Sequence, residues 1–340
     1  MGEPKRVHGA AAGKINPMGG VVALTGATGF IGSAIARKLV NDGWRVRALI
    51  RAPLRRTRFE GISIQWVHGT LETIEPLETL VGDADAVVHC AAVLRGITEA
   101  DFYPANVQAV SRLAQIAARR QPAPRFLLIS SLAAREPNLS AYAASKHMGE
   151  IALSETAGAC AWTVLRPPAV YGPGDRALLP LFRLMQHGIA PLLGRTDARF
   201  SLIYVEDLAE AVMKWLVSDS GESRVFELDD GHPSGYSWSE VAGMFERLRG
   251  KPVFRFQVSE LPMNVAARLN QIAASLVGYA PMFTPGKVRE LRHPDWVCDN
   301  SAFCQAANWK PTMCLEEGLR TTLASNGVTQ PASFTRRRHP

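Results

Sequence analysis

The chain contains 340 residues, of which 47% are hydrophobic and 20% charged, and its formal net charge is +7. This composition is that of an ordinary globular protein, and the length suffices for one large α/β unit with a smaller lobe. Five scattered cysteines without a C-x-x-C pair exclude a disulfide framework and a zinc site and favour a reducing, cytoplasmic compartment. No apolar run reaches the roughly 18 residues that a membrane-spanning helix needs.

Much of the positive charge lies in the first 19 residues, in the loop from Arg51 to Arg58, and in the tail 329–340. We expect 1–19 to be a flexible leader without a secretory signal, because it lacks a continuous apolar core. Basic and aromatic residues are not interleaved, so no nucleic-acid partner is expected. The basic tail predicts a solvated segment, with peripheral contact to an anionic membrane as the alternative.

Apolar, strand-like runs alternate with helical patterns through the first half of the chain. Strands are expected at 21–26, 44–50, 62–69, 85–92, 125–131 and 161–167, with helices that include about 30–41 and 101–120. The alternation predicts an α/β fold with a Rossmann-like, doubly wound parallel sheet over 20–167. After Pro167 proline and glycine become frequent, which predicts a smaller, mostly helical substrate lobe over 168–328, interleaved with late elements of the core.

The segment TGATGFIG places Gly26, Gly29 and Gly32 between the first expected strand and the first helix. Glycine in this turn lets the backbone approach a pyrophosphate, and the N-terminus of the following helix favours negative charge. The strand–turn–helix context predicts a dinucleotide site, and a tight turn with packing glycines is the alternative.

The second expected strand ends at Ile50, and Arg51 follows where NAD-binding sites carry an acidic residue. A carboxylate would repel a 2′-phosphate, whereas a guanidinium can bind it. Arg51 therefore predicts NADP(H) as the preferred cofactor, with NAD(H) as the alternative. The three further arginines of this loop, at 55, 56 and 58, either add to the positive field or are solvated.

Tyr142 and Lys146 stand one helical turn apart, downstream of Ser130 and Ser131 at the end of a buried strand. Beside a nicotinamide, the ammonium of Lys146 is expected to lower the pKa of the Tyr142 phenol, while a serine hydroxyl holds the substrate oxygen. The set predicts acid–base chemistry at the carboxyl end of a parallel strand, where such sheets bind ligands. A surface pair on a helix is the alternative for Tyr142 and Lys146.

Together, TGATGFIG, HCAA, the two serines before YAASK, LRPPAVYGPGD and IYVEDLAEA resemble the extended short-chain dehydrogenase/reductase superfamily. This group contains nucleotide-sugar epimerases, dihydroflavonol-type reductases and 3β-hydroxysteroid dehydrogenases. The resemblance runs from about Val21 to Phe245. It implies a Rossmann-like core, a nicotinamide dinucleotide, and catalysis by Tyr142 and Lys146 with Ser131, for which Ser130 is the alternative.

The resemblance also implies which residues contact the cofactor, and they follow successive strands along one edge of the sheet. They are Gly26, Thr28, Gly29, Phe30, Ile31, Arg51, Thr70, Leu71, Ala91, Ala92, Asn106, Ser130, Tyr142, Lys146, Pro167 and Val170. Thr70 stands where relatives often carry an aspartate that contacts the adenine, so a weaker contact is expected there. The resemblance also implies a homodimer formed through the helices that carry 101–120 and 140–158.

The segment 261–291 has helical apolar spacing and is followed by basic residues. Core packing of the substrate lobe explains this pattern. The alternative is an apolar pocket or a membrane-facing surface that admits a lipid-like ketone. Bacterial 3-oxo-ceramide reductases and accessory subunits of mitochondrial complex I look similar at this level. His89, His147 and His187 lack metal-ligand spacing, so structural roles and no metal are expected.

Three functions follow. The first is an NADP(H)-dependent oxidoreductase that interconverts a ketone and a secondary alcohol on a small, hydrophobic or lipid-like substrate, such as a 3-oxo-ceramide or a sterol-like ketone. The second is a nucleotide-sugar epimerase or dehydratase with tightly bound NAD, against which Arg51 and the apolar segment argue. The third is a non-catalytic nucleotide-binding subunit of a larger complex, which would not need the complete serine, tyrosine and lysine set.

Overall fold

The structure is a computed structural model, and it describes residues 19–51, 59–218 and 223–325. Most of the leader expected at 1–19, the arginines at 55, 56 and 58, and the basic tail expected at 329–340 lie outside these ranges. The predictions for those segments remain predictions.

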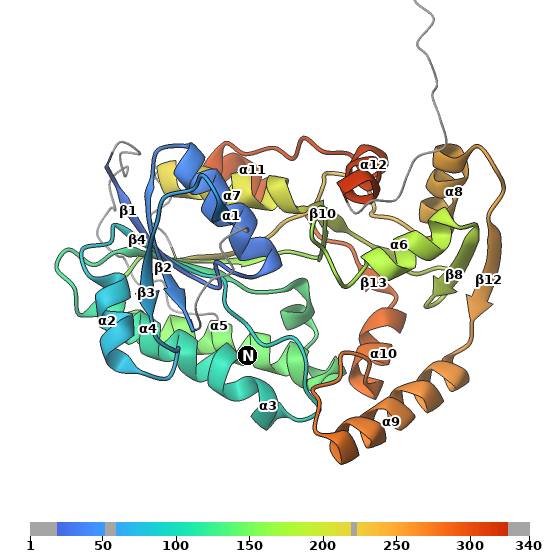
Figure 1. The fold of residues 1–340 in the computed structure, drawn as a ribbon, viewed down its shortest axis with the longest axis horizontal. Coiled ribbons are helices and arrows are strands. Elements are labelled where there is room, and N and C mark those ends of the chain that lie inside the picture. The colour runs from blue at the N-terminus through green and yellow to red at the C-terminus, as the bar shows by residue number, and fades with distance from the viewer. Residues whose placement is uncertain (1–18, 52–58, 219–222, 326–340) are drawn as a thin grey trace, which may run out of the picture.

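A seven-stranded parallel sheet forms the centre of the molecule, with strand order β3–β2–β1–β4–β5–β6–β11 (Figure 1). Its strands are β1 (Val21–Thr25), β2 (Arg45–Ile50), β3 (Ile64–His68), β4 (Ala86–His89), β5 (Arg125–Ile129), β6 (Trp162–Arg166) and β11 (Arg224–Glu227). All pairs are parallel, and the order reverses between β1 and β4. This is the predicted Rossmann-like, doubly wound arrangement, and its reversal point is where such sheets bind ligands.

Helices cover both faces of this sheet. One face carries α1 (Phe30–Asn41), α7 (Val205–Val217) and α11 (Ser301–Ala307), and the other carries α2 (Ile74–Val81), α4 (Ala109–Ala118) and α5 (Ala141–Thr156). Side chains alternate between two cores, so that Leu24 packs with Ile35 and Trp215 on the first face, and Phe126 packs with Leu113 on the second. Burial on both sides explains why the strands read as continuous apolar runs.

The helix expected at about 101–120 is broken into three parts. They are α3 (Glu99–Tyr103), a π-helical turn η2 (Pro104–Gln108) and α4. The π turn begins at Pro104, which cannot donate a backbone hydrogen bond. It contains Asn106, one of the residues predicted to contact the cofactor. Such single π turns are frequent at functional sites.

The C-terminal lobe is mostly helical, as predicted. It contains α6 (Leu179–Gln186), α8 (Trp238–Arg249), α9 (Glu260–Val277), α10 (Pro285–Arg292) and α12 (Leu315–Ser325). Three parallel pairs accompany them, namely β7 (Ala169–Tyr171) with β10 (Leu202–Tyr204), β8 (Ile189–Leu193) with β12 (Phe254–Val258), and β9 (Arg199–Phe200) with β13 (Asp295–Trp296). Across the described ranges, no helix has the length and apolar character needed to cross a membrane.

Candidate active site

The loop between β1 and α1 brings bare backbone close to the loop after β4. Gly26 has φ +75°, and a Cβ there would lie 2.6 Å from the Ala91 nitrogen. A Cβ at Gly32 would lie 2.1 Å from the Gly26 carbonyl oxygen. Gly29 caps α1, a helix of twelve residues whose first turn holds no acidic side chain. This cradle at a positive helix end fits the pyrophosphate of a dinucleotide.

Around the cradle, the neighbouring loop segments hold the other residues predicted to contact the cofactor. Thr28 is exposed, while Phe30 and Ile31 are half-buried in the first turn of α1. Ala91 donates its N–H to the Thr25 hydroxyl over 3.2 Å, and Ala92 beside it is exposed. These residues lie at the point where the strand order reverses, so the sequence prediction and the fold agree on the edge of the sheet.

His89 lies at the end of β4, and its Nδ1 is 2.8 Å from the Thr25 hydroxyl. Its Nε2 is buried without a hydrogen-bond partner. Burial, with a smaller effect of the Lys146 charge, lowers the pKa of His89 to about 3 from its ordinary value of 6.5. The folded chain therefore binds fewer protons than the unfolded chain between these values, so this contribution to stability is complete above pH 6.5 and is lost as the pH falls toward 3.

Replacing His89 with asparagine is expected to remove part of the acid sensitivity of folding. The native chain should lose about 2 kcal/mol more than His89→Asn between pH 7 and pH 5, because only the native chain must keep a buried neutral imidazole. Urea unfolding of both proteins at the two pH values measures this difference. Equal losses in both proteins would show that His89 takes up a proton without unfolding.

Arg51 directly follows β2, the strand that pairs with β1, and its side chain is exposed. It therefore stands at the same edge of the sheet as the glycine loop. Thr70 follows β3, but its hydroxyl is engaged by Thr73 and by the Glu72 N–H at 3.3 and 3.2 Å. The Leu71 carbonyl accepts a hydrogen bond of 2.6 Å from Arg112. The residues after β3 are thus held by local contacts.

The two serines after β5 make different contacts. The Ser130 side chain is buried and donates to the carboxylate of Glu150. The Ser131 side chain is half-buried and accepts the Ala133 N–H over 3.2 Å, and it lies near enough to Tyr142 to lower the pKa of that phenol. Successive residues of an extended chain alternate in direction, which separates the two hydroxyls. Ser131 is therefore the serine beside the tyrosine.

Tyr142 lies in the first turn of α5, which begins where the Ser140 side chain accepts the Ala143 N–H over 2.9 Å. Burial raises the pKa of the Tyr142 phenol, while the nearby Ser131 side chain lowers it and the Glu290 charge raises it. This corrects the sequence prediction, in which Lys146 lowers this pKa. Withdrawal from water outweighs the local partners, so the phenol of this structure is held protonated.

Lys146 is buried one turn further along α5. Its ammonium donates to the Ile129 carbonyl, the last residue of β5, over 2.9 Å. Burial lowers the pKa of Lys146 to about 8, whereas Cys90 and the Glu150 carboxylate raise it. The lysine is thus anchored on the strand that carries the two serines, and it is only weakly held in its charged form.

Asn106 connects the π turn to the loop after β4. Its side-chain oxygen accepts the Val93 N–H over 2.8 Å, and its nitrogen donates to the Val93 carbonyl and to the Ser145 hydroxyl over 3.0 and 2.9 Å. Ser145 in turn donates to the Tyr142 carbonyl over 2.7 Å. A Cβ at Gly149 would lie 2.2 Å from the Asn106 carbonyl oxygen, so α5 needs glycine there to pack this closely.

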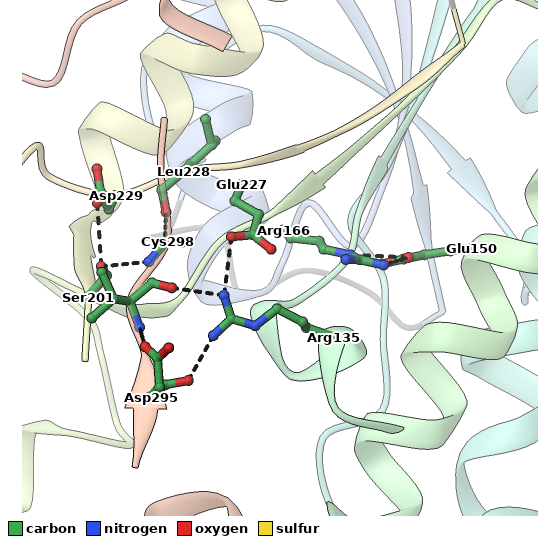
Figure 2. A network of polar contacts seen from close by, with 10 residues as sticks. Arg135, Glu150, Arg166, Ser201, Glu227, Leu228, Asp229, Asp295 and Cys298 are labelled. Atoms are coloured by element: carbon green, nitrogen blue, oxygen red, sulfur yellow. Dashed lines mark hydrogen bonds and ion pairs between the residues drawn. The ribbon is translucent and has the colours of Figure 1, made fainter. Parts of the chain in front are cut away.

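Glu150, which accepts a hydrogen bond from the Ser130 hydroxyl, forms an ion pair with Arg166 (Figure 2). This pair was not predicted from the sequence. Arg166, the last residue of β6, donates to the two Glu150 oxygens at 2.6 to 3.2 Å. The Arg166 side chain is 17% exposed and the Glu150 side chain 7%. The sequence did contain one indication that Glu150 belongs to the site. Glu150 follows Lys146 by four residues, which places both on the same face of α5.

A second arginine ties the segment after Ser131 to the C-terminal lobe. Arg135 ends a 3₁₀ turn, η3 (Leu132–Arg135), and pairs with Glu227 of β11 at 3.4 Å. It also donates to the carbonyls of Asp295 and Val297 over 2.7 and 2.8 Å, as Figure 2 shows. The loop that presents Ser131 is therefore held in place by strands from the far end of the chain.

The remaining predicted residues follow β6. The Pro167 carbonyl accepts the Leu132 N–H over 2.8 Å, and Val170 in β7 packs against the sheet core. The structure thus places the predicted residues at the carboxyl edge of six neighbouring strands. Among the described residues, no group of His, Cys, Asp and Glu is arranged to hold a metal ion.

Residues 22–228 match the family model described as the NAD dependent epimerase/dehydratase family. The chain belongs to this family. It is an NAD(P)-dependent oxidoreductase of the extended short-chain dehydrogenase/reductase type, which confirms the resemblance seen in its motifs.

Curated relatives of this epimerase/dehydratase family member include two reductases. The ceramide reductase of Caulobacter vibrioides (strain NA1000 / CB15N) is 37% identical over 278 residues, which cover 82% of this chain and 86% of that protein. The 4-hydroxy-2-methyl-3-oxo-4-farnesyl-3,4-dihydroquinoline-1-oxide ketoreductase of Stigmatella aurantiaca is 29% identical over 175 residues, 46% of this chain and 52% of that protein.

Among solved structures, MoeE5 in complex with UDP-glucose and NAD is similar with a TM-score of 0.68. The identity is 22%, and the match covers 90% of this chain and 98% of that one. The likeness shows that this family member has the fold of MoeE5.

Proposed function

We propose that this protein is an NADP(H)-dependent oxidoreductase that interconverts a ketone and a secondary alcohol on a small, hydrophobic or lipid-like substrate. Such a substrate would be a 3-oxo-ceramide or a sterol-like ketone. The observation that carries the proposal is Lys146, buried in the helix of Tyr142 with its ammonium donating over 2.9 Å to the Ile129 carbonyl, at the strand end that carries Ser131. The name of the 37% identical relative, a ceramide reductase, supports a lipid ketone.

In this proposal the glycine loop and Arg51 would hold the dinucleotide, with Lys146, Pro167 and Val170 on its nicotinamide side. A bound nicotinamide supplies a hydride to the carbonyl carbon or accepts one from the alcohol carbon. Ser131 donates a hydrogen bond to the substrate oxygen. In the direction of reduction the Tyr142 hydroxyl gives its proton to that oxygen, and in oxidation the phenolate takes a proton from the alcohol.

The protonation state of Tyr142 matches its role in reduction. A phenol that stays protonated at neutral pH is already in the form that donates a proton. Lys146 stands next to it with a pKa of about 8, which suits a group that returns a proton to the phenolate after each turnover. Asn106 and Glu150 act by position, since the first holds Ser145 under Tyr142 and the second holds Ser130 and Arg166.

Arg51→Ala is expected to weaken NADPH binding by about ten- to hundredfold and to leave NADH binding within about twofold. A charge-assisted hydrogen bond to a 2′-phosphate contributes about 1.5–3 kcal/mol, and NADH has no phosphate there. Fluorescence titration of both cofactors into the full chain measures this, and Arg120→Ala, an exposed arginine beyond the end of α4, is the control. An equal loss for both cofactors would contradict the assignment of Arg51.

The bound cofactor of the purified protein distinguishes the alternative functions. The first experiment denatures the protein and identifies any released dinucleotide by mass spectrometry. Retained NAD would favour a nucleotide-sugar epimerase or dehydratase, which keeps its cofactor through the reaction. Retained NADPH without turnover of any ketone would favour a nucleotide-binding subunit without catalysis. Exchangeable NADPH that is consumed with a 3-oxo-ceramide supports the reductase.

We propose that the protein is cytoplasmic and acts peripherally at the inner face of the membrane. We also propose that it is a homodimer and has no nucleic-acid partner. The homodimer would use the helical segments 99–118 and 141–156. Tyr103 and Ile151, each 42% exposed, stand on these segments and support such a contact. Light scattering of Ile151→Glu against the native chain tests it.

A further inference from the structure

Helix α9 carries an apolar stripe on the side that faces solvent. Its members are Leu261, Val265, Leu269, Ile272 and Leu276, with exposed fractions from 49% to 82%. At about 100° per residue these five side chains fall within an arc of about 80°. They form one continuous ridge along most of the helix, which we call the α9 stripe. Of the two sequence readings of 261–291, core packing does not account for these residues.

The α9 stripe lies opposite the face by which the helix is attached. The buried residues of α9 are Met263, Ala267 and Ala274, on the far side of the helix from the stripe. Met263 and Ala267 form a small cluster with Val288 of α10. Figure 1 shows α9 at the rim of the molecule, outside the sheet and its covering helices. Packing within the described chain therefore does not require the stripe to be apolar.

The charges around the stripe are of one sign. No aspartate or glutamate occurs from Leu261 to Arg289, in a chain that contains 31 acidic residues. Of the three basic residues in this segment, exposed Arg268 borders the stripe. Lys287 and Arg289 lie on α10, behind α9, where Lys287 pairs with Glu290 at 2.7 Å. Glu260, just before the stripe, is paired with Arg292 at 3.4 Å. An apolar ridge with a positive border fits a surface that is apolar inside and negatively charged outside.

The segment after α9 contacts the loop that follows β4. Gly96 donates its N–H to the Pro281 carbonyl over 3.2 Å, which joins the loop after β4 to the turn between α9 and α10. Leu94 of the same loop is 54% exposed, and Arg95 beside it is exposed. That loop begins with Ala91 and Ala92, next to the glycine cradle. This contact joins the segment just after α9 to the loop that borders the glycine cradle.

We propose that the α9 stripe is the surface by which this protein lies on a lipid bilayer that contains anionic lipids. The five apolar side chains enter the interface between headgroups and acyl chains, and Arg268 at the border of the stripe contacts lipid phosphates. A second copy of the chain is disfavoured as occupant, because two acid-free positive segments would repel each other. The inference goes beyond the proposed reaction and holds whichever ketone is reduced.

The test measures binding of the full chain to vesicles by flotation. Vesicles of phosphatidylcholine with phosphatidylglycerol are compared with vesicles of phosphatidylcholine alone, at low and high salt. The variant L269Q/I272Q removes two residues of the stripe, and the matched control I74Q/L184Q removes the same residue types from α2 and α6. The control residues are also exposed, at 55% and 38%.

The native chain and I74Q/L184Q are expected to bind the mixed vesicles equally, and L269Q/I272Q at least tenfold less. Binding to phosphatidylcholine alone should be weaker, and salt should weaken only the binding to mixed vesicles. Equal binding by L269Q/I272Q would overturn the proposal. So would a native dimer that becomes a monomer in L269Q/I272Q without vesicle binding by either protein. NADPH titration of each variant without vesicles tests the cofactor site independently. A loss of vesicle binding can therefore be distinguished from a failure of the proposed reaction.

Discussion

Replacing Tyr142 with phenylalanine is expected to lower kcat for the NADPH-dependent reduction of a 3-oxo-ceramide by about 10²–10⁴-fold, the usual contribution of a positioned acid. The substitution removes only the hydroxyl next to Ser131. The ring keeps its edge-to-face contact with Phe102, at 6.0 Å between centroids. Steady-state kinetics at saturating NADPH measures the loss, and unchanged NADPH affinity and melting temperature show that the site still folds.

The two serines provide a matched pair for this prediction. Ser131→Ala should lower kcat because the hydroxyl next to Tyr142 is lost, with little effect on stability. Ser130→Ala should lower stability by about 1 kcal/mol, since the Glu150 carboxylate loses one partner, and should leave kcat within a few fold. The reverse pattern would assign the substrate oxygen to Ser130. A Tyr142→Phe protein with full activity would remove Tyr142 from the mechanism.

Replacing Glu150 with alanine is expected to lower the free energy of unfolding by about 3–5 kcal/mol, because a buried ion pair is broken on one side. The guanidinium of Arg166, with 17% of its side chain exposed, would keep its charge without the carboxylate that it now binds with two nitrogens. Urea unfolding at pH 7 measures the difference. Glu150→Gln, which keeps the size and loses the charge, should fall between alanine and the native chain.

The control replaces the whole network. The variant S130A/E150M/R166M removes both charges and the serine hydroxyl at similar volume, and should recover most of the stability lost in Glu150→Ala. Glu150→Gln should also shift the pH dependence of kcat, because the Glu150 charge raises the pKa of Lys146 and its removal lowers that pKa further below about 8. A small loss of stability in Glu150→Ala would mean that Arg166 reaches water.

Strands β1, β4 and β5 could be predicted because they are buried along their whole length and mostly apolar. Strand β3 is partly exposed and was predicted from its alternating pattern, and the edge strand β11, half of it exposed, was not predicted. The expected strand at 125–131 ends at Ile129 in the structure, although the Ser130 N–H still donates to the Leu165 carbonyl of β6 over 2.8 Å and its side chain donates to Glu150. The same holds at 85–92, where β4 ends at His89 and the following alanines turn toward the glycine loop. The differences at strand ends are thus the residues of the candidate site.

Other features depend on contacts that a single sequence does not display. The π turn starts at Pro104 and carries Asn106, whose amide contacts Val93 and Ser145, and the sequence pattern had indicated one continuous helix there. The pKa of Tyr142 moves opposite to the prediction because the spacing to Lys146 indicates a neighbour but not the extent of burial. The apolar period of α9 was readable, but which face meets the protein could be known only from the attachment of Met263 and Ala267.

The chain order of the central sheet limits how this protein can be divided and recombined. Strand β11 pairs with β6, and α7 and α11 cover one face of the sheet, although α7 and β11 follow the first part of the substrate lobe in sequence and α11 follows α10. A hybrid enzyme made by joining the first half of one relative to the second half of another would therefore mix strands within one sheet. New substrate preferences are better transplanted as internal segments, such as 232–292, whose two ends return to the same scaffold.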